Sequence, residues 1–310
     1  MNEKATVWAL AGPTASGKTA LSVQVAARCG CEIVCMDSMQ IYRGMDVGTA
    51  KPTPAEMAGI PHHMMDVADP REPFSVAMYQ EMAEKVMGDI LARGHTPLLV
   101  GGTGFYLRAL TNPMTMGMVP ADDALRDELQ ALADGENGAQ KLHDLLAEVD
   151  PVTAERLPLG DVRRMIRAYE VWKKTGIPFS NQPQTQRELP FRYRVAALTL
   201  DRAALYERCD ARVDSMLGSG LVDEVRGLLA SGVPADCQAM KGIGYKELTP
   251  VCLAGASLDA AVYTIKLNTR HYAKRQLTWF RHEDGLTWFD GLSAHAADAL
   301  TAFYTEEDAE

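Results

Sequence analysis

The eight residues Gly12-Pro13-Thr14-Ala15-Ser16-Gly17-Lys18-Thr19 decide the fold of this chain. They match the pattern G-x-x-x-x-G-K-[ST], follow a short apolar run at Val7–Ala11, and precede a helix-like segment at Ala20–Arg28. A strand, such a loop and a helix in this order form a phosphate-binding loop, whose backbone N–H groups surround an anion at the helix N-terminus. Lys18 adds a positive charge for the terminal phosphate, and Thr19 adds a hydroxyl for Mg²⁺. We therefore expect the chain to bind a di- or triphosphate.

Short apolar strands alternate with helices on both sides of this loop. The predicted strands are Val7–Ala11, Glu32–Met36, Leu98–Val100, Arg194–Leu200 and Leu286–Phe289. Helices are predicted from Lys18 and over Val76–Arg93. This alternation predicts an α/β fold, a P-loop NTPase-like parallel sheet flanked by helices. Because ligands bind beyond the carboxyl ends of such strands, we expect the phosphate-binding loop, Asp37-Ser38 and Gly101–Gly104 to meet at one crevice.

A second pattern begins after Leu107, where the strands stop. The periodicity is helical from about Asp122 to Lys174, and Pro and Gly mark short turns. We predict a mainly helical insertion domain at residues 116–189, within an α/β core made of residues 1–115 and 190–310. Further helical stretches are predicted over Arg202–Ser231 and Leu258–Phe280, and the chain closes with an acidic tail whose composition is compatible with disorder.

The amino-acid composition is typical of a globular protein. It has 310 residues, 47% of them apolar, and a net charge of −10, which argues against a protein coated with basic surface but allows a local basic stripe. No apolar stretch is long enough to cross a bilayer, and Met1–Lys4 lead directly into the first predicted strand. The six cysteines lack the paired spacing of a zinc site. We expect a cytoplasmic protein without membrane association, acting as a monomer.

Asp37 ends the second predicted strand beside the phosphate-binding loop. In this place a carboxylate could bind magnesium, act as a general base on an incoming nucleophile, or cap a following turn. No clear second acidic motif of an ATPase is present. The residues leave these three roles open.

Two smaller motifs permit more than one interpretation. Gly101-Gly102-Thr103-Gly104 is compatible with a second phosphate site and equally with a tight strand-to-helix turn, in which Thr103 is the side chain able to donate a hydrogen bond. The adjacent His62-His63 point in different directions on a regular backbone and have no third ligand at a standard spacing. A structural role is therefore favoured over a zinc site for these histidines.

Basic residues gather in two places despite the acidic net charge. The late helix carries Lys266, Arg270, His271, Lys274, Arg275 and Arg281, interleaved with Tyr272, Trp279 and Phe280. The insertion carries Arg163, Arg164 and Arg167. Two such clusters favour a highly charged phosphate partner over a merely solvated helix face. Lys241–Lys246 contains two glycines, an aromatic residue and two lysines, a composition suited to close approach to a nucleotide and to stacking.

In combination, these motifs resemble the bacterial tRNA dimethylallyltransferase (IPP transferase) family. The resemblance runs in order from residue 7 to about residue 290. It rests on the phosphate-binding loop and the segments Asp37–Tyr42, Gly48–Pro52, His62-His63, Gly101–Tyr106 and Lys274–Arg281.

The resemblance implies an Mg²⁺-dependent prenyltransferase that modifies tRNA. Such enzymes move a dimethylallyl group from dimethylallyl diphosphate to N6 of the adenosine 3′ of the anticodon, in tRNAs reading codons that begin with U, and release diphosphate. The partners implied are dimethylallyl diphosphate and the tRNA anticodon stem-loop. The phosphate-binding loop then holds a diphosphate leaving group, although a nucleotide such as ATP would fit the same loop.

Residue roles follow from the same resemblance. The catalytic residues implied are Lys18, Asp37 and Thr103, with Asp37 placed to take the N6 proton. The diphosphate or nucleotide site comprises Gly12, Pro13, Thr14, Ala15, Ser16, Gly17, Lys18, Thr19 and Arg212, and Thr19 also holds the metal. The tRNA-binding residues are Asp37, Ser38, Met39, Gln40, Thr103, Arg126, Arg163, Arg164, Met165, Ile166, Arg167, Lys241, Gly242, Ile243, Gly244, Tyr245, Lys246, Lys274, Arg275 and Arg281.

Two other function classes remain open at this stage. A phosphate-loop kinase for small molecules would explain the loop and the crevice, but would leave both basic clusters without a use. An RNA-binding module with an inactive nucleotide site would explain the basic clusters and would show no turnover.

Overall fold

The computed structural model describes residues 4–113, 119–183 and 186–306. Contacts divide the chain into two compact units, one made of Met1–Pro113 with Glu188–Glu310 and the other of Met114–Arg187. The sequence placed the first domain boundary at residue 115 or 116, outside the described residues.

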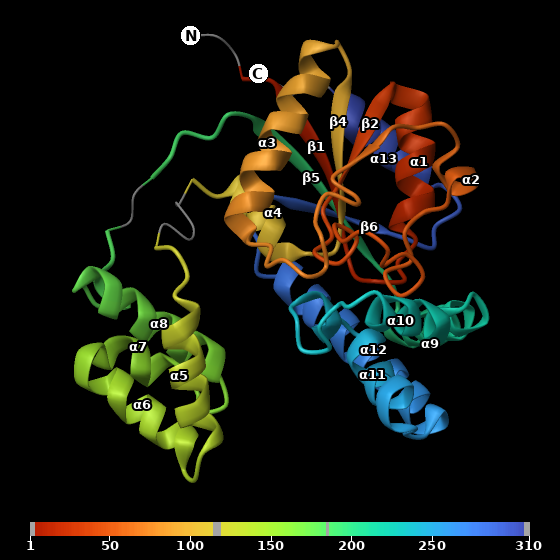
Figure 1. Cartoon of the computed structure of the whole chain (residues 1–310). Helices are drawn as coiled ribbons and strands as arrows, with labels where there is room; N and C mark the ends of the chain where they lie inside the picture. The colour runs from red at the N-terminus through yellow and green to blue at the C-terminus, as the bar shows by residue number, and fades with distance from the viewer. Residues whose placement is uncertain (1–3, 114–118, 184–185, 307–310) are drawn as a thin grey trace. The chain divides into compact units, whose positions relative to one another are not determined.

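The first unit is built on a parallel sheet (Figure 1). Its strands within the described residues are β1 (Thr6–Ala11), β2 (Cys31–Cys35), β3 (His62–His63), β4 (Thr96–Gly101), β5 (Arg192–Thr199) and β6 (Leu286–Asp290). They lie in the order β3-β2-β4-β1-β5-β6, and every neighbouring pair is parallel. This confirms the predicted α/β fold. β1 lies inside the sheet, so its carboxyl end opens onto the middle of one sheet edge.

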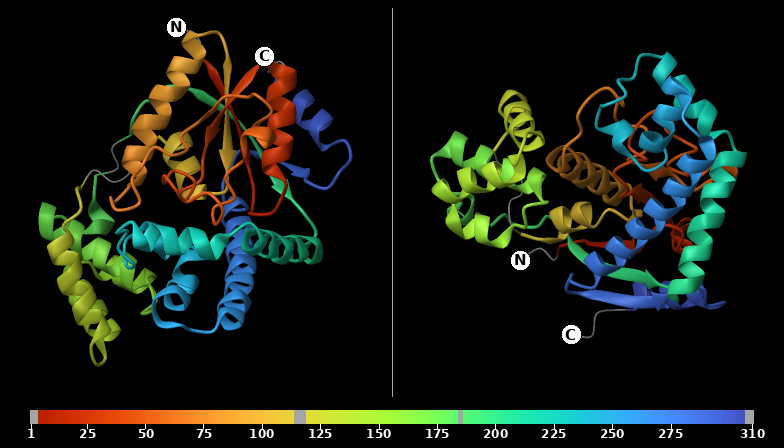
Figure 2. Two further views of the ribbon diagram at one scale, coloured as in Figure 1. Left: turned by 45° about the vertical axis from the view of Figure 1, so that its right-hand side comes forward. Right: turned by 90° about the horizontal axis from the view of Figure 1, so that it is seen from below.

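Helices cover both faces of the sheet because each inner strand is apolar on both sides. Helices α1 (Lys18–Cys29) and α13 (Ala296–Thr305) pack on one face, and α3 (Val76–Ala92) and α4 (Gly104–Thr111) on the other (Figure 2). Leu10 of β1 is buried with the first pair, whereas Ala9 and Ala11 are buried with the second. The Tyr304 hydroxyl donates to the Ala9 carbonyl over 2.6 Å and fixes α13 to the central strand.

Four helices gather beyond the carboxyl ends of the strands (Figures 1 and 2). They are α9 (Arg202–Gly218), α10 (Leu221–Ala230), α11 (Tyr245–Ala254) and α12 (Leu258–Phe280), with the 3-10 turn η2 (Ala239–Lys241) before α11. The short helix α2 (Pro54–Met57) precedes β3. The helices α9–α12 bring side chains from the last third of the chain to the edge of the sheet where the phosphate-binding loop lies.

The second unit is a small helical bundle. It contains α5 (Asp123–Asp134), α6 (Gly138–Val149), α7 (Pro151–Arg156), α8 (Val162–Thr175) and the 3-10 turn η1 (Phe179–Asn181). Leu129, Leu142 and Leu146 form its core. Asp122 and Asp150 begin α5 and α7 by accepting backbone N–H groups of the first turns.

Several elements differ from the sequence prediction. The helical stretch predicted over 202–231 is divided into two helices, because α9 ends before Ser219-Gly220 and Gly220 adopts a left-handed conformation. β3 and α11 were missed: β3 has only two residues, and α11 contains Pro250. The region after β6 is not simply an acidic tail, since α13 occupies Ala296–Thr305; residues 307–310 lie outside the described residues.

Candidate active site in the crevice above the sheet

The phosphate-binding loop wraps around its own lysine. Gly12 and Gly17 have φ angles of 149° and 91°, which residues with a Cβ rarely adopt. A Cβ on Gly12 would also lie 3.2 Å from the backbone oxygen of Leu198 on β5. Lys18 Nζ donates to the carbonyls of Gly12 and Pro13 over 2.9 and 2.6 Å. The lysine is therefore held by carbonyl groups of the loop itself.

Two residues that the sequence analysis did not assign to this site anchor the loop from outside. Gln276 on α12 accepts from Thr14 N over 2.8 Å and donates to the Gly102 carbonyl over 2.8 Å, so it ties the loop to the turn after β4. Arg208 on α9 donates through Nε to the Ala15 carbonyl over 2.8 Å. Arg208 stands four residues before Arg212, a spacing that places both on one helix face.

Asp37 follows β2 and begins a tight turn. Its Oδ1 accepts the backbone N–H of Met39 over 2.8 Å and that of Gln40 over 3.4 Å. Within the described residues, Oδ2 takes part in no hydrogen bond. The turn-capping role is thus real, but it uses one carboxylate oxygen and leaves the other available for chemistry.

Thr103 fixes the same turn from the β4–α4 side. Its Oγ1 accepts from Ser38 N over 2.9 Å and donates to Ser38 Oγ over 3.3 Å. The sequence assigned Thr103 to catalysis and to tRNA contact; here its hydroxyl contacts the segment that carries Asp37. The predicted meeting of Asp37-Ser38 with the turn after β4 is therefore present in the structure.

The glycines after β4 are explained by close packing. A Cβ on Gly101 would lie 1.9 Å from the Met36 carbonyl oxygen, and one on Gly104 would lie 2.1 Å from the Trp279 ring. Gly102 likewise leaves room for Gln276. Of the two interpretations of Gly101–Gly104, this packing supports the tight strand-to-helix turn.

Opposite charges share the crevice. Burial and, to a smaller extent, the Arg212 cation lower the pKa of Lys18 to about 7, with the Asp37 carboxylate acting in the opposite direction. Burial also lowers the pKa of Arg212 from its usual value, against the field of Asp37. Tyr272 on α12 joins the same group, because burial and then Asp37 raise the pKa of its phenol. Lys18, Arg212 and Asp37 thus lie close enough to interact through the crevice.

The segment 241–246 packs beside the Asp37 turn. A Cβ on Gly242 would lie 2.4 Å from Met39 Cε, so two segments predicted to bind tRNA adjoin each other. Tyr245 is fully buried and donates to Glu224 over 2.6 Å. Its ring therefore offers no exposed face for a stacked base, and the suggestion of stacking fails at Tyr245. Lys241 and Lys246 are exposed.

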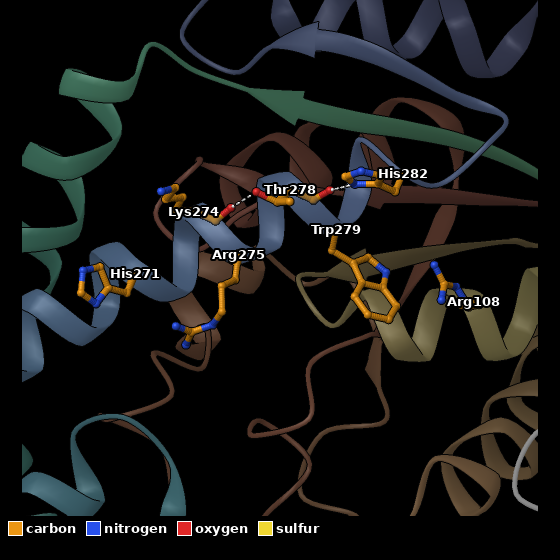
Figure 3. A pocket seen from close by; sticks show the side chains of 7 residues that line it. All are labelled: Arg108, His271, Lys274, Arg275, Thr278, Trp279 and His282. Carbon is orange, nitrogen blue, oxygen red and sulfur yellow. Dashed lines mark hydrogen bonds between the residues drawn. The ribbon is translucent and has the colours of Figure 1, made fainter. Parts of the chain in front are cut away.

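A pocket of about 550 Å³ opens on the outer face of α12 (Figure 3). It is lined by Arg108, His271, Lys274, Arg275, Thr278, Trp279 and His282. Arg108 of α4 lies 4.3 Å from the centroid of the Trp279 ring and pairs with Glu283. Lys274, Arg275 and the nearby Arg281 are exposed, as a phosphate-binding surface requires.

Two further cations of the predicted basic stripe are paired with carboxylates of a neighbouring helix. Lys266 pairs with Asp214 over 2.6 Å, and Arg270 pairs with Asp210 over 2.7 Å, both acids belonging to α9. At these two positions, the i, i+4 spacing on α12 therefore places cations against carboxylates of α9. The basic residues that stay exposed and without these partners lie in the C-terminal half of the predicted stripe.

In the helical unit, a buried carboxylate holds two of the predicted tRNA-binding arginines. Glu170 is fully buried and accepts from Arg126 Nε and Nη2 over 2.8 and 2.9 Å and from Arg167. Burial alone raises the pKa of Glu170, but the hydrogen bonds from both arginines outweigh it and keep the pKa below its usual value. Arg163 and Arg164 are exposed, so the accessible charge in the first turn of α8 lies there.

Met165 and Ile166, also predicted to bind tRNA, belong to the core of the helical unit. Their exposed fractions are 0% and 6%, and they pack with Leu129 and Leu142. Their side chains fill the bundle because positions 165 and 166 face inward while 163 and 164 face solvent. Any tRNA contact through these two side chains would require the bundle to open.

The donor groups near the loop suit Mg²⁺ better than a transition metal. Within the described residues no cluster of three His, Cys, Asp or Glu side chains could hold a metal. His63 Nε2 instead contacts Glu32 over 2.6 Å, and His62 contacts the Ile60 carbonyl over 2.8 Å. Mg²⁺ needs few protein ligands when phosphate oxygens and water complete its shell. The Thr19 hydroxyl at the start of α1 and the free oxygen of Asp37 are groups of that kind.

Comparison with known proteins identifies relatives over nearly the whole chain. Residues 40–283 match the family model for IPP transferase, and residues 5–68 match that for isopentenyl transferase. A tRNA dimethylallyltransferase from Geobacillus thermodenitrificans is 48% identical over 94% of this chain and 91% of its own. One from Geobacter metallireducens is 47% identical over 93% of both chains.

Solved structures agree with these relatives. The tRNA isopentenylpyrophosphate transferase of Bacillus halodurans has a TM-score of 0.72, with 41% identity, over 97% of this chain and 96% of its own. A eukaryotic dimethylallyltransferase acting on tRNA has a TM-score of 0.77, with 27% identity, over 96% of this chain and 78% of its own. Among the described residues, no helix is long and apolar enough to span a membrane.

Proposed function

This chain belongs to the IPP transferase family of tRNA dimethylallyltransferases, and from that premise we propose how its crevice works. The dimethylallyl group passes from dimethylallyl diphosphate to N6 of the adenosine on the 3′ side of the anticodon, in tRNAs that read codons beginning with U. One observation carries the proposal: the anion-binding lysine and Asp37 share a single crevice, with their charges coupled. We further propose that the protein acts as a monomer in the cytoplasm.

The phosphate-binding loop binds the leaving group. Cleavage of the carbon–oxygen bond places negative charge on the diphosphate, and stabilising that charge is the main electrostatic task of the site. Lys18, the inward N–H groups of the loop and the N-terminus of α1 supply it. Arg208 and Arg212 lie on the α9 side of the loop, where Arg208 already contacts the Ala15 carbonyl. This use of the loop requires no second acidic motif.

The Asp37 turn receives the acceptor base. An adenine enters such a pocket only after it leaves the stack of the anticodon loop. The free oxygen of Asp37 accepts the N6 hydrogen bond and takes the proton as the new carbon–nitrogen bond forms. Ser38, Met39, Gln40 and Thr103 keep the turn in place and line the approach of the base.

We propose Mg²⁺ as the cofactor, held by Thr19 and by the diphosphate itself. When bound, it neutralises charge on the departing diphosphate. The same loop would accept a nucleoside triphosphate, so ATP binding without a role in transfer is compatible with this site.

The tRNA backbone contacts two sets of exposed cations. One consists of Lys274, Arg275 and Arg281 beside the α12 pocket, and the other of Arg163 and Arg164 on α8. Lys241 and Lys246 extend the first set along the segment that packs on Met39. Each set supplies the phosphate contacts that hold an anticodon stem-loop in register.

The function is tested by incubating the protein with unmodified tRNA, Mg²⁺ and either dimethylallyl diphosphate or ATP. We expect tRNA to gain the mass of one dimethylallyl group with the first compound, and the modified base to be the adenosine 3′ of the anticodon. ATP consumption with a small acceptor would favour a kinase. Tight tRNA binding without turnover would favour an RNA-binding module.

Replacing both Arg163 and Arg164 with Gln should lower tRNA affinity and flatten its salt dependence by about one to two units of slope. These two side chains are exposed, whereas Arg126 and Arg167 hold the buried Glu170, and their removal would leave its charge unpaired. The measurement is a tRNA binding titration at several salt concentrations. As a control, Lys141 and Arg156, exposed on other helices of the same unit, are changed to Gln. Equal slopes for both double variants would show that α8 has no special role.

Diphosphate affinity should depend on pH through Lys18. Burial together with the nearby Arg212 lowers the pKa of Lys18 to about 7 in the free protein, whereas a bound anion requires the protonated amine. Affinity is therefore full below pH 7 and falls by up to about tenfold for each pH unit above it. Binding of inorganic diphosphate is measured from pH 6.5 to 8.5, and the Lys18→Arg variant corrects for titration of the ligand because its cation does not titrate there. Parallel curves for both proteins would contradict a low pKa of Lys18.

A further inference from the structure

Glu224, on α10, gathers three consecutive backbone N–H groups of the loop at residues 46–48. Its Oε2 accepts from Asp46 N over 2.8 Å and from Val47 N over 2.7 Å, and its Oε1 accepts from Gly48 N over 2.9 Å. Successive N–H groups that converge in this way form a concave site for an anion. Here the anion is a side chain of the protein itself, so the loop conformation depends on that carboxylate.

The fourth hydrogen bond to Glu224 comes from Tyr245 at the start of α11. The Tyr245 hydroxyl donates to Oε1 over 2.6 Å. Gly48 lies directly against this ring, since a Cβ there would be 2.5 Å from Tyr245 Cζ. The carboxylate, the glycine and the phenol therefore form one packed contact between the loop and α10–α11. We call these three residues the Glu224 clamp.

Immediately beyond the clamp, the loop turns its carbonyls toward the crevice. Gln40 Nε2 donates to the carbonyls of Thr49 and Ala50 over 3.1 and 3.2 Å. Arg212 Nη2 donates to the same Thr49 carbonyl over 3.3 Å. The loop thus holds one residue of the Asp37 turn and one cation of the diphosphate side through adjacent carbonyl groups.

Both polar groups of the Gln40 side chain form hydrogen bonds within the protein. Its Oε1 accepts from the Cys35 thiol over 3.2 Å, and its backbone N–H contacts Asp37 Oδ1. A shift of residues 49–50 would therefore be transmitted to the Asp37 turn on one side and to Arg212 on the other.

We propose that Glu224 is a positioning residue for prenyl transfer: by fixing residues 46–48 it sets the Thr49 and Ala50 carbonyls that orient Gln40 and Arg212 about Asp37. It contacts neither substrate and acts through the loop. The inference deepens the proposed function and rests on it for its kinetic consequence.

Glu224→Gln tests the clamp with little change in shape. An amide has one accepting oxygen, so its NH₂ group must face at least one of the loop N–H groups or the Tyr245 hydroxyl. Because a displacement near 1 Å can cost about 10²-fold in rate, we expect single-turnover transfer to fall about 10- to 100-fold, with tRNA affinity within about threefold of wild type. Tyr245→Phe, which removes one of four hydrogen bonds, should have a smaller effect. The matched control is Asp223→Asn, because Asp223 lies next to Glu224 on α10 but is exposed; its rate should equal wild type.

A double-mutant cycle separates positioning from simple loss of stability. If Glu224 acts through Gln40, the double variant Glu224→Gln with Gln40→Ala should be within about twofold of the slower single variant. Rate losses that multiply would overturn the proposal, as would a Glu224→Gln rate equal to wild type.

Amide hydrogen exchange gives a readout that needs no turnover. Protection of the N–H groups of residues 46–48 should fall in Glu224→Gln and stay unchanged in Asp223→Asn. Unchanged protection in both variants would refute the clamp. Absence of transfer by the wild-type protein would refute the proposed function instead, so the two failures are distinguishable.

Discussion

Asp37→Asn is expected to lose about two or more decades of single-turnover transfer rate while binding tRNA within a few-fold of wild type. The exocyclic amine of adenine is a poor nucleophile, because its lone pair is delocalised into the ring. It must lose a proton as the new bond forms, and a positioned carboxylate typically contributes about 10²–10⁴-fold to such a step. Asparagine removes that basicity and keeps the size of the side chain.

The geometry makes this substitution unusually informative. Oδ1 of Asp37 caps the turn through the N–H groups of Met39 and Gln40, whereas Oδ2 has no partner in the described part of the chain. The side-chain carbonyl of the introduced asparagine can continue to cap the turn, so only the free oxygen is exchanged for an amide. A general base and a cap, which the sequence left as alternatives, are therefore separable in one variant.

The measurement is pre-steady-state prenyl transfer with enzyme in excess, beside a tRNA binding titration. Ser38→Ala serves as control, since it removes one hydrogen bond from the same turn without touching the carboxylate. A near-wild-type rate for Asp37→Asn would mean that the carboxylate only caps the turn, and that water or diphosphate takes the proton. A rate restored by higher Mg²⁺ would assign Asp37 to the metal.

Local signals were sufficient for most of the fold. The phosphate-binding loop located β1 and α1, and apolar runs located β2, β4 and β5 within two residues of their observed ends. β3 was not predicted, because two residues are too few to show the alternation of a strand. Its position in the sheet depends on partners distant in sequence: Ile33 N–H donates to the Pro61 carbonyl, and His63 contacts Glu32. α13 was not predicted either, because its alanine-rich sequence has a weak apolar pattern whose buried side is defined by packing with α1.

Long-range partners explain what the sequence could not show about the site. Gln276 reaches Thr14 across 262 positions of sequence, and no local pattern marks it. The same limit applies to charges: Arg126 and Arg167 resemble free cations until Glu170 is found buried between them. Lys266 and Arg270 fit a phosphate-binding face by spacing, yet α9 supplies their partners. Residue type and period predict which groups can do chemistry, and packing decides which of them remain available.

Lys18→Ala is expected to slow transfer by about 10²–10³-fold and to weaken diphosphate binding, while tRNA affinity stays nearly intact. Loss of a single preorganised donor to a developing anion has effects of this size. In the free protein Lys18 Nζ faces the carbonyls of Gly12 and Pro13, inside the loop. Lys274 and Arg275, by contrast, are exposed on α12. The proposed leaving-group site and the proposed tRNA surface of the first unit are thus built from different side chains, so we expect that each can be damaged alone.

Stability measurements show whether this lysine serves function or fold. Its amine lies where burial lowers the pKa to about 7, and its hydrogen bonds go to two carbonyls and the Ser16 hydroxyl, not to a carboxylate. Removal of such a charge, which leaves no opposite charge unpaired, seldom destabilises a protein strongly. We therefore expect the melting temperature of Lys18→Ala to remain within about 2–4 °C of wild type, the shift that about 1 kcal/mol produces in a domain of comparable size. Lys18→Arg keeps a cation in the loop and should retain more diphosphate affinity than Lys18→Ala. Collapse of tRNA binding in a folded Lys18→Ala protein would show that loop and basic surfaces act as one site, because only shared contacts could transmit the loss.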